Sequence, residues 1–169
     1  LQALKRSPRD SLLQTKMGQA LQKTHQYGKA LNYYKEAVKD EQNSSLRYDM
    51  AELQMRLKTY ERAEKTIQAA LQLEQDSAND LASLMSQARF YTLLAKVQEK
   101  SNNPAASLET LATTKELRSR ILKRVQVEQP DAVLEQKQLA AKVCHTMAEQ
   151  SVLQRKYDAA IKHYKEALQ

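Results

Sequence analysis

The residues that could perform acid–base or nucleophilic chemistry are few and widely spaced. The three histidines, His25, His145 and His163, stand far apart, and none is followed by the Glu and second His of a metalloprotease helix. Cys144 adjoins His145, but consecutive residues of a helix point about 100° apart and do not readily share a proton. We therefore expect a protein that is not an enzyme and that takes no cofactor, metal or small-molecule substrate.

Cysteine and glycine usage narrows the possible sites further. A single cysteine, Cys144, cannot form an internal disulfide or a cysteine-rich zinc site, which indicates a reducing compartment. We predict that its side chain is buried and unreactive. The two glycines, Gly18 and Gly28, are too few and too far apart for a dinucleotide fingerprint or a phosphate-binding loop.

Positive charge is the strongest remaining chemical feature. The chain has 27 Lys and Arg against 20 Asp and Glu, a formal charge of +7. A solvated cationic face can bind phosphate backbone, an anionic membrane or an acidic stretch of a protein. On a helix, such a face would lie opposite Leu117, Ile121 and Val125. The candidate basic face consists of Lys115, Arg118, Arg120, Lys123 and Arg124.

The elements that carry these groups are helices. Among 169 residues, 41% are apolar, and only two are Gly and three Pro, too few for the turns of a sandwich or barrel. We predict an all-α chain in which Ser7 caps the first helix and Asn103 caps the sixth. The eight expected helices lie near 8–24, 27–41, 45–58, 60–75, 78–101, 104–127, 131–155 and 157–169.

Internal repeats decide how these helices are arranged. Tyr27 is followed by Ala30, Tyr34 and Ala37, and an aromatic residue with alanines at the same offsets recurs from Tyr60 and from Tyr157. These offsets follow one helix face, and the small residues allow a second helix to approach closely. Each helix pair must stack on its neighbours to close a core. The predicted packing positions are Gly18, Ala30, Tyr34, Ala37, Ala51, Ala63, Ala70, Ala95, Ser107, Ala148, Ala160, Tyr164 and Ala167.

This pattern resembles the tetratricopeptide repeat (TPR) superfamily. The resemblance implies a right-handed α-solenoid over residues 1–169, with repeats near 11–43, 44–77, 88–121 and 141–169. Inserts at 78–87 and 122–140 are expected to lengthen the middle three helices. It also implies that Tyr27, Tyr60 and Tyr157 are core residues rather than a stacking platform.

In TPR arrays the first helix of each pair lines a concave groove that receives a peptide or helix. Thr15 and Gln19 replace the Lys and Asn of the known carboxylate clamp, and Asp49 would repel a carboxylate, so a co-chaperone function is disfavoured. No polar code repeats along the groove, which weighs against RNA recognition. The expected groove residues are Leu12, Thr15, Gln19, Gln22, Lys23, Tyr48, Glu52, Met55 and Arg56.

Three stretches resemble a narrower family, the long, all-TPR subunits of intraflagellar transport complex A: LKRSPRDSLLQTKMGQA at 4–20, RILKRVQVEQPDA at 120–132 and KQLAA at 137–141. The second stretch is the most diagnostic because it lies in an insert that helical packing does not dictate. The resemblance implies a piece of a longer protein of the cytoplasm and cilium, at the axoneme and basal body. It also implies a role in retrograde transport and ciliary cargo entry. The expected partners are other subunits of that complex, and any membrane contact is indirect.

The two function classes that remain are a non-catalytic protein-interaction scaffold and, as the alternative, a nucleic-acid-binding helical array that uses residues 115–124. Nucleic-acid partners are the less expected of the two, because the other basic residues are interspersed with acidic ones as on an ordinary solvated surface.

Overall fold

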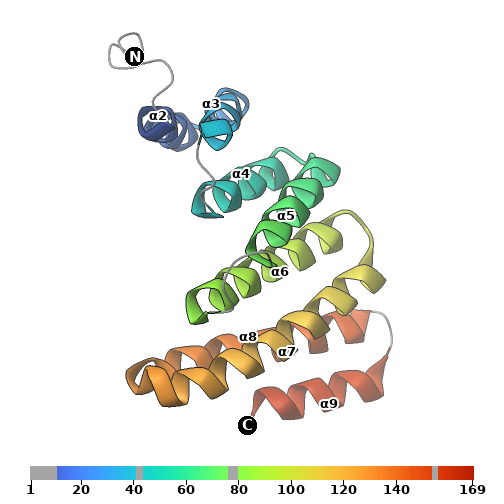
Figure 1. Cartoon of the computed structure of the whole chain (residues 1–169). Helices are drawn as coiled ribbons and strands as arrows, with labels where there is room; N and C mark the ends of the chain where they lie inside the picture. The colour runs from blue at the N-terminus through green and yellow to red at the C-terminus, as the bar shows by residue number, and fades with distance from the viewer. Residues whose placement is uncertain (1–10, 41–43, 76–79, 154–155) are drawn as a thin grey trace. The chain divides into compact units, whose positions relative to one another are not determined.

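The computed structural model describes residues 11–40, 44–75, 80–153 and 156–169, and this part of the chain is all-α, as predicted (Figure 1). The helices are α2 (Ser11–Lys23), α3 (Tyr27–Asp40), α4 (Ser44–Arg56), α5 (Tyr60–Gln75), α6 (Leu81–Lys100), α7 (Pro104–Glu128), η1 (Pro130–Ala132), α8 (Val133–Leu153) and α9 (Tyr157–Ala167). Helices that follow one another along the chain pack together, α2 with α3, α6 with α7 and α8 with α9, which is the arrangement of an α-solenoid. Within the described ranges, no helix is long and apolar enough to cross a membrane. The predicted cap at Ser7 lies outside the described residues.

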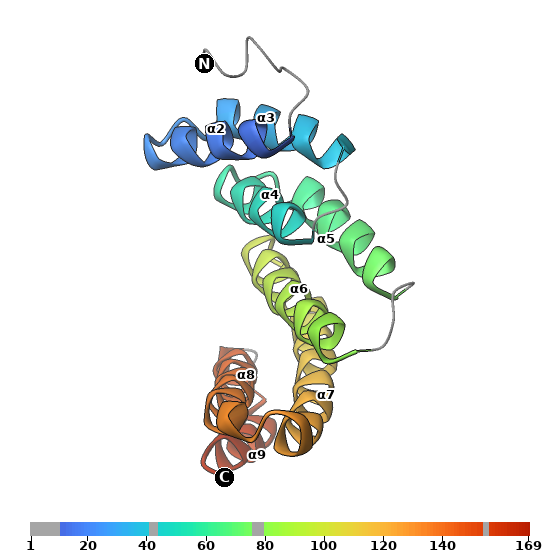
Figure 2. The ribbon, with the colours of Figure 1, turned by 60° about the vertical axis from the view of Figure 1, so that its left-hand side comes forward.

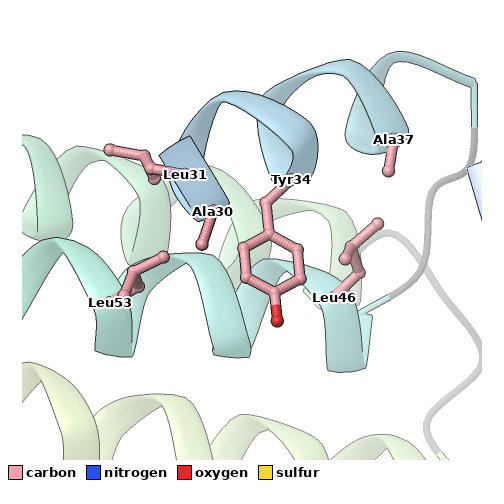
Figure 3. Packing of buried hydrophobic residues seen from close by; sticks show 6 residues of the cluster. All are labelled: Ala30, Leu31, Tyr34, Ala37, Leu46 and Leu53. Carbon is pink, nitrogen blue, oxygen red and sulfur yellow. The ribbon is translucent and has the colours of Figure 1, made fainter. Parts of the chain in front are cut away.

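The chain divides into two compact units, residues 1–70 and 71–169. In the first unit the core joins α3 to α4 (Figure 3). Tyr34 is fully buried and points from α3 toward α4, beside Ala30 and Ala37 of its own helix and Leu46 and Leu53 of α4. The two alanines leave room for the ring because they have no side chain beyond Cβ.

Gly18 lets α2 approach this core closely. A Cβ atom built on Gly18 would lie 3.2 Å from Cε1 and Cζ of Tyr34 and 3.4 Å from the Ala30 carbonyl oxygen. The Tyr34 hydroxyl donates a hydrogen bond of 3.2 Å to Gln22 Oε1, so the ring is held at both ends. Burial, and secondarily Asp49, raise the pKa of Tyr34 to about 12, which keeps this hydroxyl protonated.

The second unit contains the three long helices, and their predicted extension is confirmed: α6, α7 and α8 have 20, 25 and 21 residues. Asp80 Oδ1 caps α6 by accepting the Ser83 amide at 2.7 Å. The predicted cap of α7 is confirmed, since Asn103 Oδ1 accepts the Ala106 amide at 3.4 Å and Pro104 is the first helical residue.

The added length of these helices builds a core of its own. Figures 1 and 2 show α7 beside α6 and α8, with α9 against α8. One apolar cluster joins α6 to the C-terminal half of α7 and consists of Leu81, Leu84, Ala88, Leu117, Ile121 and Val125. A second cluster lies where α6, α7 and α8 meet and consists of Ala95, Leu111, Val143 and Met147.

The described turns after α2, α4 and α6 use left-handed backbone at residues other than glycine. His25, Lys58 and Asn102 each have φ of 61°. The following amides, those of Gln26, Thr59 and Asn103, donate to the carbonyls of Leu21, Gln54 and Gln98 at 2.9, 3.0 and 2.9 Å. These are the hydrogen bonds of a Schellman C-cap, which normally favours glycine at the left-handed position.

Most of the predicted packing positions are buried, including all seven in the first unit. Three positions of α9 depart from the expectation. Tyr164 is 37% exposed and Tyr157 is 58% exposed, so the prediction that they are core residues is wrong, and Ala167 is only half-buried. Ala160, on the same face of α9, is buried, and the Tyr164 ring, whose centroid lies 5.8 Å from that of His145 on α8, contacts α8 without being enclosed by it.

Candidate functional site

The nine expected groove residues lie on α2 and α4, and none belongs to the buried core. Leu12 is 59% exposed, and Gln19, Lys23 and Arg56 are exposed as well. The other five, Thr15, Gln22, Tyr48, Glu52 and Met55, are half-buried. Every one of these side chains therefore presents surface that a ligand could contact.

Four of these residues line one hollow of about 410 Å³ in the first unit: Gln19, Gln22, Lys23 and Arg56. Arg56 Nη2 is 3.3 Å from Glu52 Oε1, so its charge is partly balanced within α4. Leu12, Thr15, Tyr48 and Met55 do not line this hollow. The expected groove therefore consists of two parts: four polar residues that line the hollow, and five residues, Glu52 included, that do not.

Two further residues line the same hollow and were missed from the sequence: His25 and Tyr27. His25 Nδ1 lies 2.7 Å from the Tyr27 hydroxyl, with the two rings edge to face. His25 is in the turn after α2, where helical periodicity gives no orientation. The signal that could have found it is its place three residues from Gln22, at the end of the groove helix.

The prediction of one solvated basic face on α7 is wrong. Arg118 is only 6% exposed, and Lys115 pairs with Glu166 of α9. Arg124 pairs with Glu128 at 2.9 Å, so the exposed members of the set are Arg120 and Lys123. The reason is that α8 packs against a flank of α7 that lies outward when the helix is plotted alone, and that Glu166 of α9 reaches Lys115.

The side chain of Cys144 is buried, as predicted. Its thiol donates to Glu166 Oε2 at 4.0 Å, and burial, the largest cause, raises its pKa, which disfavours the thiolate. The neighbouring His145 is exposed and lies 3.2 Å from Glu149 Oε1. Cys144 and His145 therefore face different groups and form no nucleophile pair.

His163 and Glu166 form an electrostatic cluster with Lys115. Burial lowers the pKa of His163, and Lys115 lowers it further, while a hydrogen bond from Lys115 lowers the pKa of Glu166. His163 Nδ1 is buried without a hydrogen-bond partner in the described part of the chain. Among the same residues, no group of three or more His, Cys, Asp or Glu side chains is placed to hold a metal ion.

Buried glutamines form a second feature that sequence reasoning missed. Thr66 Oγ1 donates to Gln54 Oε1 at 2.7 Å, and Thr110 Oγ1 lies 2.6 Å from Gln98 Oε1. Both glutamines are buried, and each lies twelve residues before its threonine, on the preceding helix of the same hairpin. Gln54 departs from the TPR pattern in sequence, and its bond to Thr66 explains why a polar residue is accommodated there.

A smaller hollow, of about 110 Å³, lies in the second unit and is lined by residues of α6, α7 and α8. Its walls combine apolar residues with charged ones, and the buried Arg118 is among them. Arg118 Nη1 donates to Gln136 Oε1 at a long 3.5 Å, and its Nε has no partner among the described residues. Burial, and secondarily the charge of Arg89, lower the pKa of Arg118.

Comparison with solved structures supports the fold. A crystal structure of MamA superimposes with a TM-score of 0.72 at 16% identity, covering 99% of this chain and 81% of that one. A MamA double mutant gives a TM-score of 0.68, also at 16% identity, over 98% of this chain and 77% of that one. At such low identity these likenesses show the fold alone.

Comparison with curated proteins shows closer relatives. The chain is 49% identical over 167 residues to tetratricopeptide repeat protein 21B of Homo sapiens, covering 99% of this chain and 12% of that protein. It is 42% identical over 168 residues to tetratricopeptide repeat protein 21A of Mus musculus, covering 99% of this chain and 13% of that protein. The chain thus spans only a small part of the length of these relatives.

A protein-family model described as "Tetratricopeptide repeat protein 21 forth ARM domain" matches residues 13–168, nearly the whole chain. The match includes all the helices from α3 to α9 and both inserts that lengthen the middle three. The chain belongs to the tetratricopeptide repeat protein 21 family.

Proposed function

We propose that this chain is a non-catalytic protein-interaction segment of an intraflagellar transport complex A subunit. It acts with other subunits of that complex in retrograde transport and in ciliary cargo entry, in the cytoplasm and at the axoneme and basal body of the cilium. The observation that carries the proposal is the family match across residues 13–168. The diagnostic stretch at 120–132, which falls within that match and resembles complex A subunits, supports it.

The groove residues of α2 and α4 are proposed as a contact surface for a partner segment. The hollow at Gln19, Gln22, Lys23 and Arg56 offers amide and cationic groups that remain accessible. TPR arrays work by presenting such surfaces on a scaffold rather than by reactive groups. We assign four repeats, at 11–43, 44–77, 88–121 and 141–169, and the first two carry this surface.

The alternative of nucleic-acid binding loses its main support from the burial of Arg118 and the pairing of Lys115 and Arg124. A phosphate-binding face needs several cations free to displace counterions. A salt titration with duplex and single-stranded oligonucleotides tests this point. Tight, steeply salt-dependent binding near physiological ionic strength would favour the alternative.

The proposed function is tested by affinity purification of the full-length parent protein from ciliated cells, with identification of the proteins that co-purify. We expect recovery of the intraflagellar transport complex A subunits. The variant Lys23→Glu, at the hollow, should reduce recovery of one partner, whereas Lys35→Glu makes the same charge change at an exposed site on α3 and should not. Absence of all transport subunits from the wild-type eluate would refute the proposal.

A further inference from the structure

The hollow at α6, α7 and α8 has an uneven charge distribution. Its charged residues are three cations, Lys96, Arg118 and Lys142, and one carboxylate, Glu99. Glu99 Oε2 already accepts a hydrogen bond of 3.3 Å from Gln150 Nε2. The lining therefore has an excess of positive charge that groups of the described chain do not neutralise.

Of these three cations, Arg118 is the one that is buried, whereas Lys96 and Lys142 are exposed to solvent. The Arg118 side chain is more than nine-tenths buried, yet within the described ranges the structure gives it no carboxylate partner. The charge of another cation, Arg89, acts on the guanidinium and opposes its positive charge. A buried guanidinium without a counter-ion is costly, because transfer out of water is repaid only by close ionic and hydrogen-bonding partners.

The remaining walls identify the kind of group that fits. Ala95, Leu111 and Val143 make part of the hollow apolar, which suits the methylene groups of a side chain. The volume of about 110 Å³ is somewhat below that of an engineered cavity of roughly 150 Å³ that binds benzene, so it has room for one side chain rather than for a helix.

We propose that this hollow receives an aspartate or glutamate side chain from a partner protein, whose carboxylate pairs with the Arg118 guanidinium while apolar neighbours cover the rim. A carboxylate is the planar acceptor that a guanidinium binds with two parallel hydrogen bonds. The inference rests on the proposed scaffold function and names the chemistry of one partner segment.

The proposal explains why an unpaired charge persists in the free protein. Removing a buried charge that has no partner leaves stability unchanged or raises it. If a residue lowers stability but serves recognition, replacing it should raise or maintain the stability of the protein and weaken its binding of the partner. Stability and affinity measured on the same variant therefore separate a binding role for Arg118 from a structural one.

The test begins with selection of short random peptides on the full 169-residue chain. We expect enrichment of peptides in which Asp or Glu stands beside apolar residues. Replacing that acid by Asn or Gln in a selected peptide should weaken binding at least about tenfold, and this requires no change in the chain. Enrichment of peptides without an acid, or indifference to the replacement, would overturn the proposal.

Variants of the chain complete the test. The Arg118→Met variant should bind the selected peptide at least about tenfold more weakly than the wild-type chain does. Replacing the acid of the peptide should then weaken binding to this variant little further, because the partner of the acid is already gone. The melting temperature of the variant should be no lower than that of wild type. Arg120→Met removes the same charge at an exposed position of α7 and should bind normally. Wild-type affinity or a large loss of stability in Arg118→Met would contradict the proposed pairing.

A competition experiment shows whether the hollow binds a carboxylate or a phosphate. Displacement of the selected peptide by inorganic phosphate or by a single-stranded oligonucleotide near physiological salt would make the hollow a phosphate site and overturn the proposal. Failure here is distinguishable from failure of the proposed function. The parent protein would still co-purify with transport subunits if only the Arg118 pairing were wrong.

Discussion

The two glycines provide a matched pair of substitutions that tests the packing of the first hairpin. Gly18 and Gly28 both lie in helices and neither has a positive φ, so alanine is compatible with the backbone at each. Nothing lies within 4 Å of a Cβ atom at Gly28, whereas at Gly18 the ring of Tyr34 lies at 3.2 Å. The same chemical change therefore meets open solvent in one case and a buried ring in the other.

The expected magnitudes have opposite signs. Alanine in place of glycine stabilises a helix interior by about 0.8–1 kcal/mol, and Gly28→Ala, in the first turn of α3, should gain roughly half of that. Gly18→Ala has the same intrinsic gain but compresses a contact, and overpacking costs about 1–3 kcal/mol. Tyr34 cannot easily move, because it is fully buried and its hydroxyl is bonded to Gln22. We expect a net loss of about 1 kcal/mol for Gly18→Ala.

Urea unfolding followed by circular dichroism measures both variants against wild type, and unchanged slopes establish that midpoint shifts report stability. In a Tyr34→Leu background, Gly18→Ala should no longer be destabilising, because the atoms it would compress are gone. If Gly18→Ala stabilises the chain as much as Gly28→Ala does, the close approach of α2 to the Tyr34 ring is wrong.

Four other changes probe further parts of the chain. Thr66→Val should cost about 1–2 kcal/mol in urea unfolding because it leaves Oε1 of the buried Gln54 without its hydroxyl donor, and adding Gln54→Leu should recover most of this loss; additive costs would contradict the pairing. Lys58→Gly should raise the free energy of unfolding by about 0.5–1 kcal/mol, seen as a higher melting temperature, because it relieves a left-handed residue with φ of 61°. Burial lowers the pKa of His163, so the unfolded chain binds its proton more readily and stability should fall as the pH drops below about 6.5, the unperturbed value. His163→Asn should flatten that decline in unfolding experiments between neutral and mildly acidic pH, and an unchanged slope would refute the assignment. Ala160→Leu should destabilise by about 1–3 kcal/mol through overpacking against α8, and an unaltered urea midpoint would refute the assigned face of α9.

The helices and their long middle members could be predicted because both depend on local pattern. The Asn103–Pro104 cap is a signal contained in adjacent residues, and it marks the start of α7 as observed. The alanine spacing around Tyr34 identifies the face of α3 that is buried. Each of these features is determined by residues within a few helical turns of it, so the sequence alone suffices to predict it.

Arg118 shows where this reasoning stops. Plotting α7 alone correctly places Leu117 and Ile121 in the core, but it treats every other flank as solvent. Whether Arg118 or Arg120 is exposed depends on where α8 crosses α7, and the charge at either position carries no information on that crossing. Tyr164 is the converse error, since its spacing predicts a buried ring, whereas the ring contacts His145 of α8 and stays 37% exposed.

The two buried glutamine–threonine pairs fix the alignment of the two helices within the α4–α5 and α6–α7 hairpins. Gln54 with Thr66, and Gln98 with Thr110, are joined by hydrogen bonds between the two helices of one hairpin. A hydrogen bond is directional, so a shift of one helix along the other would break it and strand a buried polar group. The α3–α4 core, by contrast, joins successive hairpins through apolar contacts, which lack that directionality. Loss of one polar pair should therefore loosen the helix alignment inside its own hairpin, which hydrogen exchange of α4 and α5 amides in Thr66→Val would detect as faster exchange there than in α2 and α3.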